Sequence, residues 1–191
     1  MTAIAAGVDL SLASTGLAVV TETTIHINRV QSRGTADPTL PERRRRLSNL
    51  THHILDVLIG AAVTGRTLVV VEGPSYGQTR QGGQHDRAGL WWLLVDRMLD
   101  MGWAVAEVPP ASRAKYATGK GNAAKDSVMA AAIRRYPMAE IVGHDVADAV
   151  VLAAMGAHAL GQPPAVVPAL NATALAKVAW PALNLEGITH G

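Results

Sequence analysis

The chain has 191 residues, a formal net charge of +2 at pH 7 and no cysteine. This length suits one domain with a sizeable core, and the lack of cysteine excludes a disulfide framework and Cys-ligated zinc. No apolar run reaches the roughly 18–20 residues of a membrane span, and the first residues show no basic-then-apolar signal pattern. We therefore expect no membrane insertion and a reducing compartment, namely the cytoplasm.

The first third of the chain predicts three strands and a long helix. Residues 3–10 are typical of a strand buried on both faces, and residues 16–20 and 23–30 predict two more strands after short turns. Closely spaced strands of this kind favour an antiparallel meander. A helix is then expected over residues 41–63, with an apolar stripe at helical spacing. Its first two turns carry the block Arg43 to Arg46, where cations oppose the helix dipole. The block is either a solvated face or a contact for an anionic partner.

The middle of the chain predicts two parallel strands with a helix between them. Residues 67–71 form a dense β-branched run, typical of an interior parallel strand, which ends at Glu72. A polar Gly/Gln-rich loop over 75–85 leads into a helix over 87–101, and residues 103–108 predict the next strand.

The last third of the chain predicts helices. Pro109-Pro110 ends the preceding strand, and a loop containing TGKGN is expected before helices over 123–135 and 143–160. The order of elements implies an α/β fold: a mixed sheet of about five strands with helices on both faces. We expect residues 1–160 to form this domain and residues 161–191 to be a tail that packs on it or on a partner subunit.

Four carboxylates are the candidate functional groups. Asp9 and Glu72 each end a predicted core strand, and sites in open α/β sheets form beyond the carboxyl ends of strands. Asp145 and Asp148 lie three residues apart at the start of the last helix, so they project from one face. If the two strands are neighbours and the helix crosses their ends, all four acids converge, with no evident basic partner in the same motifs.

Converging carboxylates repel one another unless hard cations lie among them. Two Mg²⁺ or Mn²⁺ ions about 3.5–4 Å apart would bind such a cluster and support in-line hydrolysis of a phosphodiester. Each acid also has an ordinary explanation, as a turn former, a strand-end charge or a first-turn helix residue. Both interpretations stay open at this point.

Four segments of the chain resemble, in family order, the motifs of the RuvC-type Holliday junction resolvases, which belong to the RNase H-like superfamily. They are GVDLSLASTGLAVV, LVVVEGPSYG, KYATGKGNAAKDSV and GHDVADAVVLAA, and the resemblance covers residues 4–160. LPERRRRLSNL is similar to the start of the first helix of the family, and phage-encoded members are the nearest type. One departure concerns an aromatic residue that the family places three positions after the second acid. Here Ser75 holds that position and Tyr76 follows.

The resemblance implies an RNase H-like fold and a homodimeric endonuclease that resolves four-way or branched DNA in recombination and repair, with two Mg²⁺ or Mn²⁺ ions per site. In a phage-encoded member the location would be the host cytoplasm. The implied metal ligands and catalytic acids are Asp9, Glu72, Asp145 and Asp148. Lys125 is implied as a further catalytic residue that contacts the scissile region. The candidate DNA contacts are Lys115, Lys120, Lys125, Tyr76, Arg80 and Arg46.

Other functions fit parts of the same pattern. The first motif also resembles the phosphate-binding opening of actin-like and sugar-kinase ATPases, but those need a second similar domain that 191 residues do not accommodate. A non-catalytic junction-binding module is expected to lose at least one acid, and all four are present. An RNA-processing nuclease of the YqgF type would keep the fold and change the substrate. For the homodimer, Trp91 and Trp92 are the interface candidates, with burial in their own core as the alternative.

Overall fold

A computed structural model describes residues 3–64, 66–74 and 83–182 of the chain. Its centre is one five-stranded sheet with the strand order β3-β2-β1-β4-β5. Strands β1, β2 and β3 form the antiparallel meander, whereas β4 and β5 extend it in parallel with β1. The expected mixed sheet is confirmed. The strands are β1 (Ala3–Asp9), β2 (Ser14–Thr21), β3 (Ile25–Gln31), β4 (Leu68–Glu72) and β5 (Ala104–Val108).

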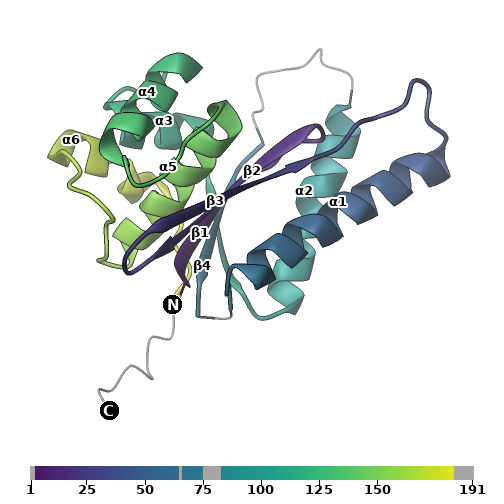
Figure 1. Cartoon of the computed structure of the whole chain (residues 1–191), viewed down its shortest axis with the longest axis horizontal. Helices are drawn as coiled ribbons and strands as arrows, with labels where there is room; N and C mark the ends of the chain where they lie inside the picture. The colour runs from purple at the N-terminus through teal and green to yellow at the C-terminus, as the bar shows by residue number, and fades with distance from the viewer. Residues whose placement is uncertain (1–2, 65, 75–82, 183–191) are drawn as a thin grey trace.

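Helices cover both faces of this sheet (Figure 1). One face packs against α1 (Leu40–Gly60) and α2 (Gln84–Asp100). The other face packs against α5 (His144–Ala159), with α3 (Pro110–Thr118) and α4 (Lys125–Arg135) beside it. Alternate strand residues serve the two cores, because successive side chains of a strand point to opposite faces. This explains why the central strands are continuous apolar runs. No helix in the described ranges is both long and apolar enough to cross a membrane.

Helix α3 lies where the sequence patterns predicted a loop, so that prediction was wrong. Proline ends a strand, but it is also favoured in the first turn of a helix, where its missing N–H would have no intrahelical partner. Pro110 opens α3, and the Arg113 N–H donates to the Pro109 carbonyl. Gly119 ends the helix in the left-handed conformation, at φ 85°.

Residues 161–182 lie against α3. They contain the short helix α6 (Ala169–Ala172) and a 3₁₀ turn, η1 (Leu175–Lys177). The buried Asn171 side chain donates to the Tyr116 carbonyl at 2.9 Å, and Ala174 and Val178 join the core on the α5 side. The Trp180 indole N–H donates to the Leu175 carbonyl at 3.0 Å. This packing gives residues 161–182 a structural role, while the division into a nuclease domain and a separate tail stays a prediction.

Helix α5 approaches the backbones of β1 and β2 closely at two glycines, Gly7 and Gly16. A Cβ atom on Gly7 would come closer than 3.0 Å to the Ala149 carbonyl oxygen and the Ala153 amide nitrogen. A Cβ atom on Gly16 would overlap the backbone of Asp145 in the same way. Glycine at these two positions therefore allows the first turns of α5 to lie directly over the carboxyl end of β1.

Candidate metal centre

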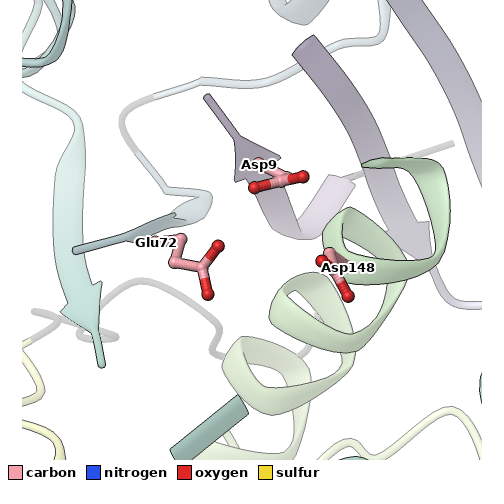
Figure 2. Close-up of side chains that lie close together, drawn as sticks. All are labelled: Asp9, Glu72 and Asp148. Atoms are coloured by element: carbon pink, nitrogen blue, oxygen red, sulfur yellow. The ribbon is translucent and has the colours of Figure 1, made fainter. Parts of the chain in front are cut away.

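Asp9, Glu72 and Asp148 converge beyond the carboxyl ends of β1 and β4 (Figure 2). The two strands are parallel neighbours with Gly7 opposite Val70, so Asp9 and Glu72, each two residues later, lie side by side. Gly7 and Val70 pack toward α5, and a strand repeats its direction every two residues, so both acids point to that side. Asp148 reaches them from α5. One oxygen from each of the three carboxylates lies within 4.8 Å of the other two.

Arg113 supplies a positive charge that the sequence motifs did not contain. Its Nε donates to Glu72 Oε1 at 2.8 Å, and its Nη1 donates to Asp148 Oδ1. The Arg113 side chain is only 8% exposed. The signal that could have located it was the favourable position of Pro110 at a helix start, which would have placed Arg113 in the first turn of a helix beside the strand ends.

Asp145 is not among the three acids whose oxygens gather, and its carboxylate has other partners. Its Oδ1 accepts a hydrogen bond from Arg29 Nη2 at 2.8 Å, and its Oδ2 accepts one from Ser14 Oγ at 2.5 Å. Arg29 also donates to the Val142 carbonyl. These contacts tie the start of α5 to β2 and β3. The role of Asp145 as a metal ligand stays a prediction.

The environment of the cluster disfavours negative charge. Desolvation raises the pKa of Asp9 well above its usual range, and the charges of Glu72 and Asp148 raise it further. Desolvation likewise raises the pKa of Asp148 to about 6, although the charge of Arg113 opposes this shift. A cation placed among these carboxyl groups would stabilise their ionised form.

The donor set fits a hard divalent cation. Three carboxylates from three different elements supply only oxygen atoms, which are the ligands that Mg²⁺ and Mn²⁺ prefer. The guanidinium of Arg113 shows that a positive charge is accommodated between Glu72 and Asp148. Asp9, Glu72 and Asp148 are therefore the residues that would hold the ion.

Trp91 supports the cluster from the opposite helical layer. Its indole N–H donates to the backbone carbonyl of Glu72 at 3.0 Å, which fixes the end of β4 against α2. The sequence patterns indicated only an interface or a core role for this tryptophan. Its neighbour Trp92 points away from the core and is 65% exposed.

The candidate DNA-contacting lysines differ in their exposure. Lys125 opens α4 on the surface, and its charge is close enough to Asp148 to lower the pKa of that carboxyl. Lys120 is exposed in the turn after α3, and Lys115 is half-buried on α3. Tyr76 and Arg80 lie outside the described residues.

Arg46 has a structural role that its basic surroundings did not suggest. Its guanidinium donates to the Leu12 carbonyl at 2.6 Å and to Ser32 Oγ at 3.0 Å. These bonds connect α1 to the turn after β1, three residues beyond Asp9. Arg46 thus holds the turn that follows the first acid, whereas its contact with DNA stays a prediction.

Solved structures with the same fold are known. The structure described as Thermus thermophilus RuvC matches with a TM-score of 0.63 and 20% identity, over 85% of this chain and 99% of that chain. T. thermophilus RuvC in complex with Holliday junction substrate matches with a TM-score of 0.61 and 19% identity, over 85% and 98% of the two chains. No family model and no curated protein matches the sequence. Neither structural match supports the expected phage origin. The chain therefore has an RNase H-like fold similar to that of RuvC, with three acids gathered at the end of its central strands.

Proposed function

We propose that this protein is a divalent-metal-dependent endonuclease that resolves four-way or branched DNA. The observation that carries the proposal is the convergence of Asp9, Glu72 and Asp148 at the carboxyl ends of β1 and β4. A similar fold occurs in RuvC, which has been solved in complex with Holliday junction substrate. Acids that gather where open α/β sheets place their sites are expected to serve chemistry, because they repel one another without a cation.

The acids of the chain would bind the metal ions, and a lysine would contact the DNA backbone. When bound, two Mg²⁺ or Mn²⁺ ions would lower the pKa of the attacking water and stabilise charge on the leaving 3′-oxygen. Asp9, Glu72 and Asp148 would hold the ions, and Asp145 is the remaining candidate for a fourth ligand. Lys125, on the surface near Asp148, would contact the phosphate backbone beside the scissile bond.

A nuclease assay on defined substrates tests the proposal. A synthetic four-way junction, a linear duplex, a Y-fork and an RNA–DNA hybrid are each incubated with Mg²⁺, Mn²⁺ or EDTA. We expect two symmetric nicks near the crossover of the junction, and only with metal. Cutting of the hybrid alone would favour the RNA-directed alternative. Junction binding without cutting under any metal condition would favour the non-catalytic binding module.

Lys125→Ala is expected to slow junction cleavage about tenfold, which corresponds to about 1.4 kcal/mol of lost stabilisation. The melting temperature should not change, because the side chain is exposed. Single-turnover cleavage rates and thermal denaturation of the purified variant measure the two effects. Lys177→Ala, which removes another exposed lysine from η1, is the control. Normal cleavage by the Lys125 variant would remove this residue from the site.

An arginine-lined cleft adjoins the same end of the sheet. It has a volume of about 360 Å³ and lies between the β3–α1 connection and the first turns of α1. Arg46, in its lining, contacts the Leu12 carbonyl just beyond β1. Arg43 pairs with Asp86, while Arg33 and Arg45 are exposed at the cleft. An arm of the DNA that leaves the metal centre on the α1 side would pass over these two arginines.

The double variant Arg33→Ala/Arg45→Ala is therefore expected to bind the junction about tenfold more weakly at low salt. The slope of log affinity against log salt concentration should fall by about 1.8, because each lost phosphate contact contributes about 0.9. Fluorescence anisotropy titrations at several salt concentrations measure this slope. Arg44→Ala is the matched control, because Arg44 is an exposed neighbour on α1 that does not line the cleft. An unchanged slope in the double variant would place the DNA elsewhere.

Resolution of a symmetric junction requires one cut in each of two strands, and a homodimer would present one equivalent site to each of them. The exposed face of α2 carries Trp92, Leu93 and Leu99 and is the proposed contact. Trp92→Ser is expected to convert a dimer into monomers in sedimentation velocity runs, because it removes the largest apolar anchor of this face. Leu170→Ser, at an exposed leucine on α6, should leave the dimer intact. A wild-type protein that sediments as a monomer at all concentrations would contradict the proposed dimer.

A further inference from the structure

We propose that Arg113 acts as the resident cation of the metal-free site and competes with divalent ions for the carboxylates of Glu72 and Asp148. The metal then binds only when the guanidinium moves away, so Arg113 sets the metal affinity of the protein. The inference rests on the proposed function only in taking the three carboxylates as metal ligands. It does not depend on cleavage of any substrate.

The contacts of Arg113 place it where an ion would have to be. Its Nε bonds Glu72 at 2.8 Å and its Nη1 bonds Asp148, so the guanidinium bridges two acids that come from different elements. The side chains of Arg113, Glu72 and Asp148 are 8%, 15% and 4% exposed. A dication coordinated by the same oxygens would lie next to the guanidinium with little water to screen their repulsion. Both charges cannot occupy the site favourably.

Removal of Arg113 would leave the acids without a counter-charge. Arg113 bridges Glu72 and Asp148, and all three side chains are largely buried, so water cannot replace it as their partner. A buried charge that loses its partner is strongly destabilising. Arg113 therefore keeps the three acids assembled in the absence of metal, at the expense of metal affinity.

The acids themselves are the groups that hold the guanidinium. In the described part of the chain, Glu72 and Asp148 are its hydrogen-bond partners. The backbone of Arg113 is fixed separately, by its N–H bond to the Pro109 carbonyl at the start of α3. The side chain can consequently leave the site when its acids are neutralised by an ion, without disruption of the helix that carries it.

Metal titration of the full chain without DNA tests this competition. Isothermal titration with Mn²⁺ is compared for the wild type, Arg113→Gln and Arg113→Lys. We expect Arg113→Gln to bind Mn²⁺ at least about tenfold more tightly, because the competing charge is gone. Arg113→Lys should lie between the two, since lysine keeps the charge but lacks the planar fork that bridges both acids. Arg134→Gln, at an exposed arginine on α4, is the control and should bind like the wild type.

Two further measurements cover the case in which Arg113→Gln does not fold. The melting temperature of metal-free Arg113→Lys should fall below that of the wild type, and Mn²⁺ should raise it by a larger increment than in the wild type. In the wild type itself, the Arg113 Nε–H resonance, assigned by its loss in Arg113→Lys, should be sharp without metal. It should shift or broaden on titration with diamagnetic Mg²⁺, as the hydrogen bond to Glu72 is released.

Unchanged or weaker Mn²⁺ affinity in the Arg113 variants would overturn the inference, because the arginine would then coexist with the ion or orient its ligands. An Nε–H resonance that Mg²⁺ saturation leaves in place would overturn it equally. A wild type and variants that bind no Mn²⁺ at all would defeat the inference together with the metal assignment. Tighter Mn²⁺ binding by Arg113→Gln without junction cleavage by the wild type would uphold the inference and defeat only the proposed nuclease.

Discussion

Asp9→Asn is expected to lower the rate of junction cleavage by about a thousandfold or more, while the variant still binds the junction. The carboxylate of Asp9 lies beside those of Glu72 and Asp148, so its loss removes one of the three ligands of the cluster. A thousandfold loss is at the upper end of what removal of one transition-state-stabilising group costs. Cleavage of a labelled four-way junction in Mg²⁺, and gel-shift binding in EDTA, measure the two properties.

The fold should survive this change. Desolvation and the neighbouring charges raise the pKa of Asp9, so the site disfavours the ionised carboxylate, and a neutral amide of the same size relieves the repulsion. Asp100→Asn, at an exposed acid on α2, is the control and should cut at the wild-type rate. Persistent Mg²⁺-dependent cutting by the purified Asp9 variant would defeat the assignment of the metal centre.

Gly7→Ala is expected to reduce the free energy of unfolding by about 3 kcal/mol, the upper end of the usual cost of overpacking. The added Cβ would meet the Ala149 oxygen and the Ala153 nitrogen, both of which are backbone atoms of α5. No side-chain rotation can relieve such an overlap, so α5 must move away from β1. Urea denaturation of the wild type and the variant measures the loss.

The same displacement would carry Asp148 away from Asp9, because Asp148 precedes Ala149 on α5. Metal affinity of the folded fraction should therefore fall together with stability. Gly60→Ala is the matched control: a Cβ there meets no atom within 4 Å, and alanine at the end of α1 should be neutral or slightly stabilising. A Gly7 variant as stable as the Gly60 variant would show that α5 does not approach β1 so closely.

The local patterns of the sequence were sufficient for most of the architecture. The apolar run of β1 predicted a strand buried on both faces, and the β-branched run of β4 predicted an interior parallel strand. The order of the elements predicted a mixed sheet, which the structure confirms. The boundaries of the helices were less accurate. Helix α1 begins at Leu40 because Thr39 and Glu42 form a capping box that precedes the apolar stripe. Helix α2 begins at Gln84, three residues before its predicted start.

The convergence of Asp9 and Glu72 was also predictable, because it follows from one topological step. Once β1 and β4 are parallel neighbours, acids that end the two strands must meet at the same edge of the sheet. Helical spacing added Asp148 on the side of α5 that faces this edge. Helical spacing could not show which of Asp145 and Asp148 reaches the cluster, because residues three apart share a face whether or not both reach the same site.

The sequence by itself determined the sheet, the helix over it and the meeting of Asp9 and Glu72, because periodicity and strand ends are local properties that burial then enforces. Only the tertiary structure decided the charge balance of that point. Arg113 reaches the acids from α3, and the carboxylate of Asp145 accepts hydrogen bonds from Arg29 and Ser14, which lie on strands more than 100 positions earlier in the chain. Side-chain partners so far apart in the chain are selected by packing, and no local pattern encodes them.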